Sequence, residues 1–313
     1  MTRFSGIIPP VVTPLLTHDQ LDPESVDRVV NHLVDGGVNG LFVLGTTGEG
    51  PSLTYQIRYE MVERSCEAAA GRVPVLVCVT DTSLAEAIHL AEHAATSGAA
   101  AVVAAAPFYF GIGQDALEDW FVRLADASPL PVLLYNMPSC VKVCLESETV
   151  ARLAKHQNIA GIKDSSGDLA YFQRLCQQHQ ADPDFVVFMG PEELIPQAVE
   201  AGADGGVCGG GNLLPHLYVE LFQAARAGDA VTVSRLRELV SEVFAHLYHA
   251  PDGTMNLIPA LKLAMSQCGL CGDTVAPPLL APAADHAAQV RQALPRILEQ
   301  AGSGLTAVAT DAL

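Results

Sequence analysis

One lysine of this chain stands where a buried strand should end. The stretch Gly161-Ile-Lys-Asp-Ser-Ser-Gly-Asp168 places Lys163 directly behind the apolar run Ile159-Ala-Gly-Ile162. A buried ammonium group is costly to desolvate, so such a lysine either finds a counter-ion or gives up its proton. By strand alternation Ile162 and Asp164 should point to the opposite side, which leaves Lys163 without a partner among its neighbours.

A free lysine amine in an apolar pocket can attack a ketone and form a Schiff base. The protonated imine withdraws electrons, so with a 2-keto acid it stabilises a carbanion at the neighbouring carbon. The carbon–carbon bond beyond that carbon can then be broken or made. The structural alternative is a lysine whose charged end simply extends from the strand into solvent.

Hydroxyl groups follow other apolar runs of the chain. In Gly45-Thr-Thr-Gly-Glu-Gly50, Thr46 and Thr47 offer hydroxyls and successive N–H groups that suit a carboxylate, and the glycines allow close backbone approach to a ligand. An ordinary glycine turn is the alternative.

Tyr109 and Tyr135 follow two further runs, and either phenol can pass protons while an imine forms if it lies within hydrogen-bond reach. A half-buried tyrosine with its hydroxyl in water is the alternative.

Short runs rich in β-branched residues recur along the chain at intervals of roughly 20 to 35 residues, and helical-period segments separate them. Such alternation is typical of a parallel sheet, and eight units over roughly 225 residues predict a (β/α)₈ barrel. A doubly wound sheet is the alternative, but no G-x-G-x-x-G follows the first run. The predicted strands are Ile7–Val12, Gly40–Leu44, Val73–Val79, Ala101–Ala105, Pro131–Tyr135, Ile159–Lys163, Phe185–Met189 and Gly205–Cys208.

Active sites of such barrels lie at the C-terminal ends of the strands, so the lysine, threonines and tyrosines should face one mouth. Strand patterning stops near Ala227, while helical patterning continues and a small-residue tail follows. We therefore predict a catalytic barrel over residues 1–226, a helical region over 227–301 and a flexible tail over 302–313. The predicted helices of the second region are Val231–Leu247, Asn256–Ser266 and Ala284–Ala301.

Composition excludes some classes of partner. The net charge of -18 argues against nucleic acid, which needs a basic surface. The sequence has neither a secretion signal at its start nor an apolar run long enough for a membrane span, so we expect a cytoplasmic protein. The eight cysteines are then expected to be reduced thiols, Cys268-Gly-Leu-Cys271 included, and no metal site is predicted.

Three motifs in register resemble the dihydrodipicolinate synthase/N-acetylneuraminate lyase family. They are Gly-Thr-Thr-Gly-Glu at 45 to 49, Tyr-Asn-Met-Pro at 135 to 138 and the lysine motif at 161 to 168. The correspondence runs from about Gly6 to the helices near residue 295. The resemblance implies a class I, metal-free enzyme without a cofactor, built on a barrel with a helical C-terminal part. It also implies pyruvate as a ligand and a homotetramer as the usual assembly.

The resemblance also implies roles for individual residues. Lys163 matches the Schiff-base lysine, and Tyr135 matches the proton shuttle above it. The carboxylate cradle is matched by Thr46, Thr47 and Gly48, and Thr46 also belongs to the proton relay. Tyr109 matches the tyrosine that completes this relay in a neighbouring subunit's site. The Val207 carbonyl would face the bound ketoacid.

Two departures bear on which reaction the chain catalyses. The synthases of the family read Tyr-Asn-x-Pro-x-Arg-Thr-Gly, whereas this chain has Cys140 in place of the arginine that grips a substrate carboxylate. After the seventh strand, Gly190-Pro-Glu-Glu193 is similar to the sugar-acid lyases, in which acidic residues accept from substrate hydroxyls. Glu192 and Glu193 are therefore expected to bind substrate, although glutamates are also favoured in the first turn of a helix.

The leading expectation is an aldolase that cleaves a 2-keto-3-deoxy sugar acid, or a related hydroxylated 2-keto acid, to pyruvate and an aldehyde. A dihydrodipicolinate synthase that condenses pyruvate with aspartate semialdehyde is the second expectation, and a dehydratase of keto-deoxy sugar acids is close to both. From a different class, a ketoacid sensor without turnover is the alternative, which retention of Lys163, Tyr135 and both threonines disfavours.

Overall fold

The computed structural model describes residues 3–307, and within them eight parallel strands form one sheet in the order β1-β10-β9-β8-β7-β6-β5-β4. Their bounds are β1 Gly6–Ile7, β4 Leu41–Val43, β5 Val75–Cys78, β6 Ala101–Ala105, β7 Val132–Asn136, β8 Ile159–Asp164, β9 Val186–Met189 and β10 Gly205–Gly206. A small antiparallel hairpin of β2 Leu15–Thr17 and β3 Gln20–Leu21 was not predicted from the sequence.

The sheet closes into a barrel between β1 and β4. The Pro9 carbonyl accepts from the N–H of Phe42 at 3.0 Å, and the N–H of Val11 donates to the Phe42 carbonyl at 2.8 Å. Pro9 and Pro10 have no N–H to donate, so the regular ladder of β1 ends at Ile7, earlier than the predicted Val12. The predicted (β/α)₈ barrel is confirmed.

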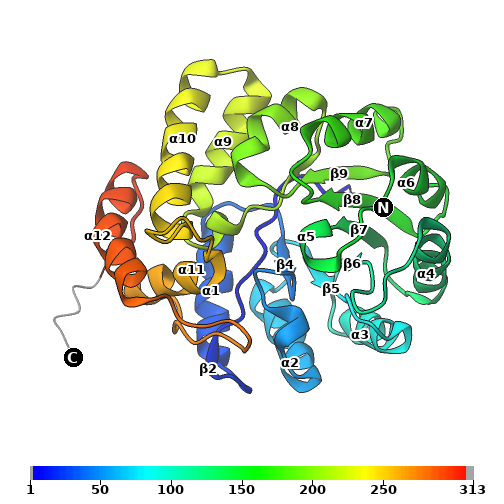
Figure 1. Cartoon of the computed structure of the whole chain (residues 1–313), viewed down its shortest axis with the longest axis horizontal. Helices are drawn as coiled ribbons and strands as arrows, with labels where there is room; N and C mark the ends of the chain where they lie inside the picture. Colours follow the sequence, from blue (N-terminus) through cyan, green and yellow to red (C-terminus); the bar gives the residue numbers. More distant parts are fainter. Residues whose placement is uncertain (1–2, 308–313) are drawn as a thin grey trace.

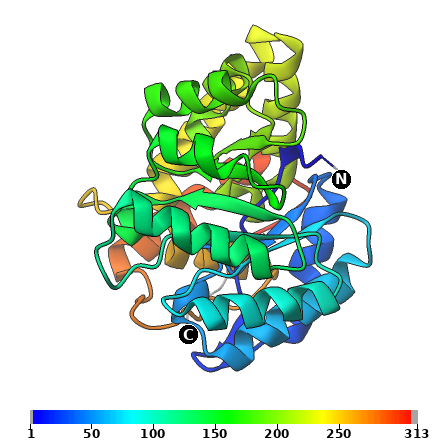
Figure 2. The ribbon, with the colours of Figure 1, turned by 90° about the vertical axis from the view of Figure 1, so that its right-hand side faces the viewer.

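Helices surround the strands (Figures 1 and 2). Several of them begin at a side-chain cap; Ser83, for example, accepts from the N–H of Glu86. The surrounding helices are α1 Pro23–Asp35, α2 Tyr55–Ala69, α3 Leu84–Thr96, α4 Gln114–Ala127, α6 Ser147–Leu153, α7 Leu169–His179, α8 Ile195–Ala201 and α9 Pro215–Ala227. Short turns follow four strands: η1 Gly50–Ser52, α5 Pro138–Val141, η2 Glu192–Leu194 and η3 Gly209–Asn212.

The C-terminal helices pack on the later part of the barrel, at the left of Figure 1. They are α10 Ala230–Val243, the π-helical turn η4 Phe244–Tyr248, α11 Leu257–Gln267 and α12 Ala284–Gln300. The segment predicted as one helix to Leu247 thus changes its hydrogen bonding in the last turn. Helix α10 contacts η2, and α11 contacts η3, so this region reaches the turns that follow β9 and β10.

The division into a barrel over 1–226 and a helical region over 227–301 stays a prediction. Residues 302–307 form no helix, and the rest of the predicted flexible tail lies outside the described residues. Across residues 3–307, no helix combines the length and the apolar character that crossing a bilayer requires.

Candidate active site

Lys163 and Tyr135 are direct partners on adjacent strands. They are paired in the parallel register of β7 and β8, so their side chains leave the same face of the sheet. The Lys163 Nζ lies 4.1 Å from the centre of the Tyr135 ring and 4.9 Å from that of Phe42. Lys163 is only 6% exposed, so its amine is held against two aromatic faces away from bulk water.

Lys163 forms no ion pair with any carboxylate among residues 3–307. The neighbouring Asp164 is engaged elsewhere: its carboxylate accepts from Asn136 Nδ2 at 2.8 Å and from the Ser166 hydroxyl at 2.9 Å. Burial raises the pKa of Asp164, although these hydrogen bonds oppose the shift. The expectation that Lys163 has no counter-ion beside it in the sequence is confirmed, and its amine is not committed to a salt bridge.

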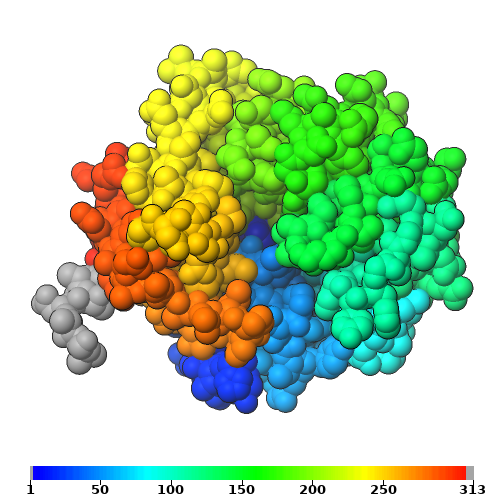
Figure 3. All heavy atoms as spheres, in the orientation of Figure 1, coloured from blue at the N-terminus to red at the C-terminus, as the bar shows by residue number. Residues whose placement is uncertain are grey.

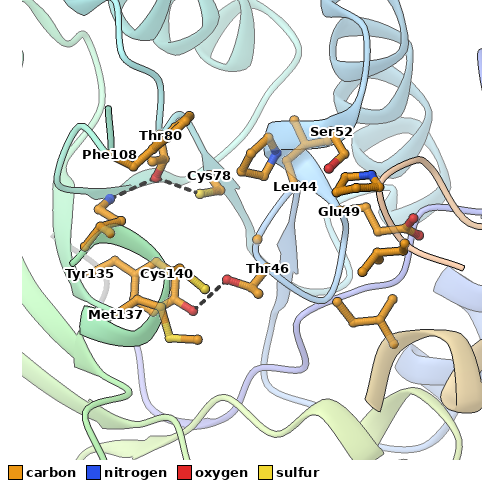
Figure 4. A pocket seen from close by; sticks show the side chains of 17 residues that line it. Leu44, Thr46, Glu49, Ser52, Cys78, Thr80, Phe108, Tyr135, Met137 and Cys140 are labelled. Atoms are coloured by element: carbon orange, nitrogen blue, oxygen red, sulfur yellow. Dashed lines mark hydrogen bonds between the residues drawn. The ribbon is translucent and has the colours of Figure 1, made fainter. Parts of the chain in front are cut away.

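A second pair joins the loop after β4 to strand β7 across the mouth. The Tyr135 hydroxyl lies 3.1 Å from the Thr46 hydroxyl, and the two side chains point toward one another in Figure 4. Thr46 follows β4, whereas Tyr135 belongs to β7. Two hydroxyls at this separation can share or pass a proton.

The loop that carries Thr46 and Thr47 is packed closely on the barrel itself. A Cβ at Gly48 would lie 2.8 Å from the Val11 carbonyl oxygen, and one at Gly50 would lie 2.0 Å from that of Leu44. These glycines are therefore required by the protein's own backbone, whereas the sequence indicated only close approach to a ligand. Leu44 adopts φ 61° and Glu49 φ 58°, left-handed conformations that cluster at functional sites.

Glu49 anchors this loop to the C-terminal region. The Lys262 ammonium donates to Glu49 Oε1 at 2.6 Å, to the Thr13 carbonyl at 2.8 Å and to the Thr274 carbonyl at 2.5 Å. The second Glu49 oxygen accepts from the N–H of Ala276 at 2.6 Å. Both side chains are fully buried. Sequence reasoning missed this pair, although a lysine within the apolar helix of α11 was a signal that it needed a partner.

A cavity of about 260 Å³ opens beside the Thr46–Tyr135 pair, and Figure 4 draws the 17 residues that line it. The molecular surface is hollowed between the orange C-terminal segment and the green segment that includes α5 (Figure 3). Four predicted site residues do not line this cavity: Lys163, Thr47, Gly48 and Val207. Lys163 lies against the Tyr135 ring. Three wall residues come from the C-terminal region and were not predicted: Ile258, Pro278 and Leu279.

The two glutamates of the turn after β9 lie in different surroundings. Glu192 is buried, and its carboxylate accepts from the hydroxyls of Tyr218 at 2.6 Å and Tyr248 at 3.0 Å and from the N–H of Gly210 at 2.8 Å. Its oxygens thus bind protein donors and hold the glycine turn after β10, and the predicted binding of substrate hydroxyls by Glu192 and Glu193 stays a prediction. Glu193 is exposed at the same turn. The N–H of Val207 donates to the Met189 carbonyl at 2.8 Å, which fixes the end of β10.

We expect the buried Glu192 carboxyl to make the folded state less stable as the pH rises. Burial raises the pKa of this carboxyl above its ordinary value of 4.5, more than its three hydrogen bonds lower it. The folded state therefore holds a proton that the unfolded state releases above about pH 4.5, and stability falls as the pH rises toward the folded-state pKa.

The Glu192→Gln variant lacks this titration, so its stability relative to the parent should improve from about pH 4.5 to neutral pH in urea unfolding. The exposed Glu193→Gln is the matched control, with no such trend. A stability difference that stays constant with pH would contradict the expectation.

Tyr109 lies apart from these groups within one chain. It is 78% exposed, its ring meets that of Phe110 edge-on with centroids 5.1 Å apart, and it is not on the cavity wall. Phe108, Tyr109 and Phe110 form an exposed aromatic cluster after β6. The predicted contribution of Tyr109 to a neighbouring subunit's site stays a prediction.

Residues 3–300 match the dihydrodipicolinate synthetase family. Among curated proteins, the chain is 35% identical over 283 residues to a probable 2-dehydro-3-deoxy-D-pentonate aldolase of Escherichia coli K12, covering 90% of this chain and 93% of that protein. It is 33% identical over 293 residues to a 4-hydroxy-tetrahydrodipicolinate synthase of Gluconacetobacter diazotrophicus, covering 94% and 97%.

Solved structures of this family also superpose on the chain. A dihydrodipicolinate synthase of Bacteroides thetaiotaomicron superposes with a TM-score of 0.91 at 44% identity, covering 95% of this chain and all (100%) of that chain. A prophage protein of the dihydrodipicolinic acid synthase family from E. coli K12, solved with pyruvate, superposes with a TM-score of 0.87 at 29% identity, covering 96% and 99%.

Proposed function

The chain belongs to the dihydrodipicolinate synthetase family, and we propose that it is an aldolase that cleaves a hydroxylated 2-keto acid, such as a 2-keto-3-deoxy sugar acid, to pyruvate and an aldehyde. As a member it is a class I lyase that works through a Schiff base with pyruvate. The observation that carries the proposal is the environment of the Lys163 amine. This amine is buried, lies 4.1 Å from the centre of the Tyr135 ring and forms no ion pair with a carboxylate of residues 3–307.

In the first stage Lys163 attacks the ketone carbon of the substrate. The carbinolamine loses water and becomes a protonated imine, and the Thr46–Tyr135 hydroxyl pair carries protons to and from the oxygen that leaves. Successive N–H groups and hydroxyls at Thr46, Thr47 and Gly48 would hold the substrate carboxylate, and the Val207 carbonyl would face it.

In the second stage Tyr135 takes the proton of the hydroxyl on the fourth carbon. That oxygen becomes a carbonyl, the bond between the third and fourth carbons breaks, and its electron pair moves to the imine, which becomes an enamine. The aldehyde leaves. A proton returns to the third carbon, and water hydrolyses the resulting imine, which releases pyruvate and restores the Lys163 amine.

Cys140 favours cleavage over lysine-pathway synthesis. A thiol cannot grip a carboxylate as the arginine of the synthase motif does, and Cys140 lies on the cavity wall. The likeness to a pentonate aldolase supports the same direction. A 4-hydroxy-tetrahydrodipicolinate synthase is the second candidate, because relatives with that activity are 33% and 34% identical to this chain.

We also propose a homotetramer in which Tyr109 reaches a neighbouring subunit's site. The support is the exposed cluster of Phe108, Tyr109 and Phe110, since such aromatic groups are common at interfaces. A cytoplasmic location is part of the proposal, and all eight cysteines are free thiols, as a reducing compartment requires.

The test is a turnover assay with 2-keto-3-deoxypentonate and 2-keto-3-deoxygluconate, with pyruvate release measured by a coupled dehydrogenase. We expect pyruvate from at least one of them. Aspartate semialdehyde plus pyruvate is the matched comparison. If that pair is consumed while neither sugar acid is cleaved, the enzyme is a synthase and the proposal is wrong.

A further inference from the structure

We propose that the aldehyde half of the substrate is uncharged and carries few hydroxyl groups, of which the protein matches about one. This inference rests on the proposed function, because only a carbon–carbon lyase has an aldehyde half to bind. The cavity beside Tyr135 is where that half would lie, since Tyr135 is the base for the hydroxyl from which the aldehyde forms.

The cavity offers no charge to a second carboxylate. None of its lining residues is lysine, arginine or histidine. Glu49 is its one acidic side chain, and both oxygens are taken by Lys262 and the N–H of Ala276. Burial raises the pKa of the Cys78 thiol, which keeps it neutral. An aldehyde with its own carboxylate would therefore lose its hydration without gaining a cation.

The nearby cations are committed to other groups. Arg58 donates to the Asp81 carboxylate at 3.0 Å and to the Leu53 carbonyl at 3.2 Å, and this pair is buried. The Lys142 ammonium donates to the Ser139 carbonyl at 2.7 Å, and Lys142 lines a separate groove with Tyr109. Neither side chain lines the cavity.

The hydroxyls on the wall are also largely engaged. Thr46 faces Tyr135, and the Thr80 hydroxyl accepts from the N–H of Ala105 at 2.8 Å and lies 3.2 Å from the Cys78 sulfur. Ser52, exposed on the wall, is the one lining serine or threonine whose hydroxyl has no hydrogen-bond partner among residues 3–307. It can match one hydroxyl of a ligand.

The rest of the wall is apolar. It includes Phe108, Met137, Val141, Ile258, Pro278 and Leu279. The volume of about 260 Å³ is below the range of roughly 300 to 1,000 Å³ that is usual for ligand pockets. Each hydroxyl of a longer polyol that is desolvated here without a partner should cost roughly ten-fold in affinity.

The first test runs the reaction toward condensation at saturating pyruvate. We expect kcat/KM for glycolaldehyde and propionaldehyde to exceed that for succinic semialdehyde, aspartate semialdehyde and erythrose by about ten-fold or more. Equal or faster reaction of a carboxylated or polyhydroxylated aldehyde would overturn the inference.

Exchange of the pyruvate methyl hydrogens with deuterated water reports enamine formation without an aldehyde. Loss of that exchange would refute the proposed function, whereas exchange with a reversed preference would refute only this inference.

The second test places a cation on the wall. Cys140→Arg should raise the kcat/KM ratio of succinic semialdehyde to glycolaldehyde by about ten-fold, because the guanidinium can pair with the carboxylate. Ser139→Arg is the matched control: it adds the same charge at an exposed position off the wall, and the ratio should not change. If Cys140→Arg leaves the ratio unchanged, or Ser139→Arg changes it equally, the charge of the wall does not set the preference.

Discussion

Replacing Lys163 by alanine should lower turnover by about 10⁴-fold or more, because the covalent route through the imine is lost rather than slowed. Lys163→Arg should fail equally. Arginine places a permanent positive charge beside Tyr135 and Phe42, and a guanidinium that remains protonated cannot attack a ketone. The pair of variants thus separates the chemistry of the amine from the electrostatics of a cation against two rings.

Trapping with borohydride in the presence of pyruvate measures the imine directly. The chain has four lysines, so mass spectrometry of peptides can assign the reduced adduct without ambiguity. We expect the adduct at position 163 in the parent and in the controls Lys142→Ala and Lys155→Ala, and none in Lys163→Ala. An adduct at another lysine, or normal turnover in Lys163→Arg, would contradict the assignment of the nucleophile.

Local pattern was enough to predict the barrel and the environment of Lys163. The period of each apolar run fixes whether a segment is a strand or a helix, and strand alternation separates Lys163 from Asp164. The first strand was predicted too long, because the apolar run to Val12 contains two prolines that cannot donate to a ladder.

The parts that could not be predicted depend on contacts between distant segments. Glu192 was expected at the substrate because an acidic turn after a strand also fits that role. Its partners within the chain, Tyr218 and Tyr248, lie in two different helical elements, and Tyr248 is in a π-helical turn with no sequence pattern of its own. The cavity wall is a similar case, since Ile258 and Leu279 face it only after the C-terminal region has packed on the barrel.

Lys262→Met should destabilise the fold by about 3 to 5 kcal/mol, because it leaves the buried Glu49 carboxylate without its cation. Methionine fits the space of the lysine but donates nothing, so only the N–H of Ala276 would still bind Glu49. Urea unfolding followed by far-UV circular dichroism and by fluorescence measures the loss. Lys155→Met, at an exposed lysine, is the control and should unfold like the parent.

The double variant Glu49→Gln, Lys262→Met should regain part of that stability, because the uncompensated buried charge is gone. It should not regain the full affinity for pyruvate. Glu49 fixes the left-handed turn that ends the Thr46–Thr47 loop, and the ion pair ties this loop to α11 and to the segment around Thr274. Recovered stability with a raised KM for pyruvate would indicate that the pair positions the carboxylate cradle. Recovery of both stability and pyruvate affinity would mean that the ion pair serves stability alone. For the single variant Lys262→Met, a loss of stability below about 1 kcal/mol would show that the Glu49 charge is not buried as the geometry requires.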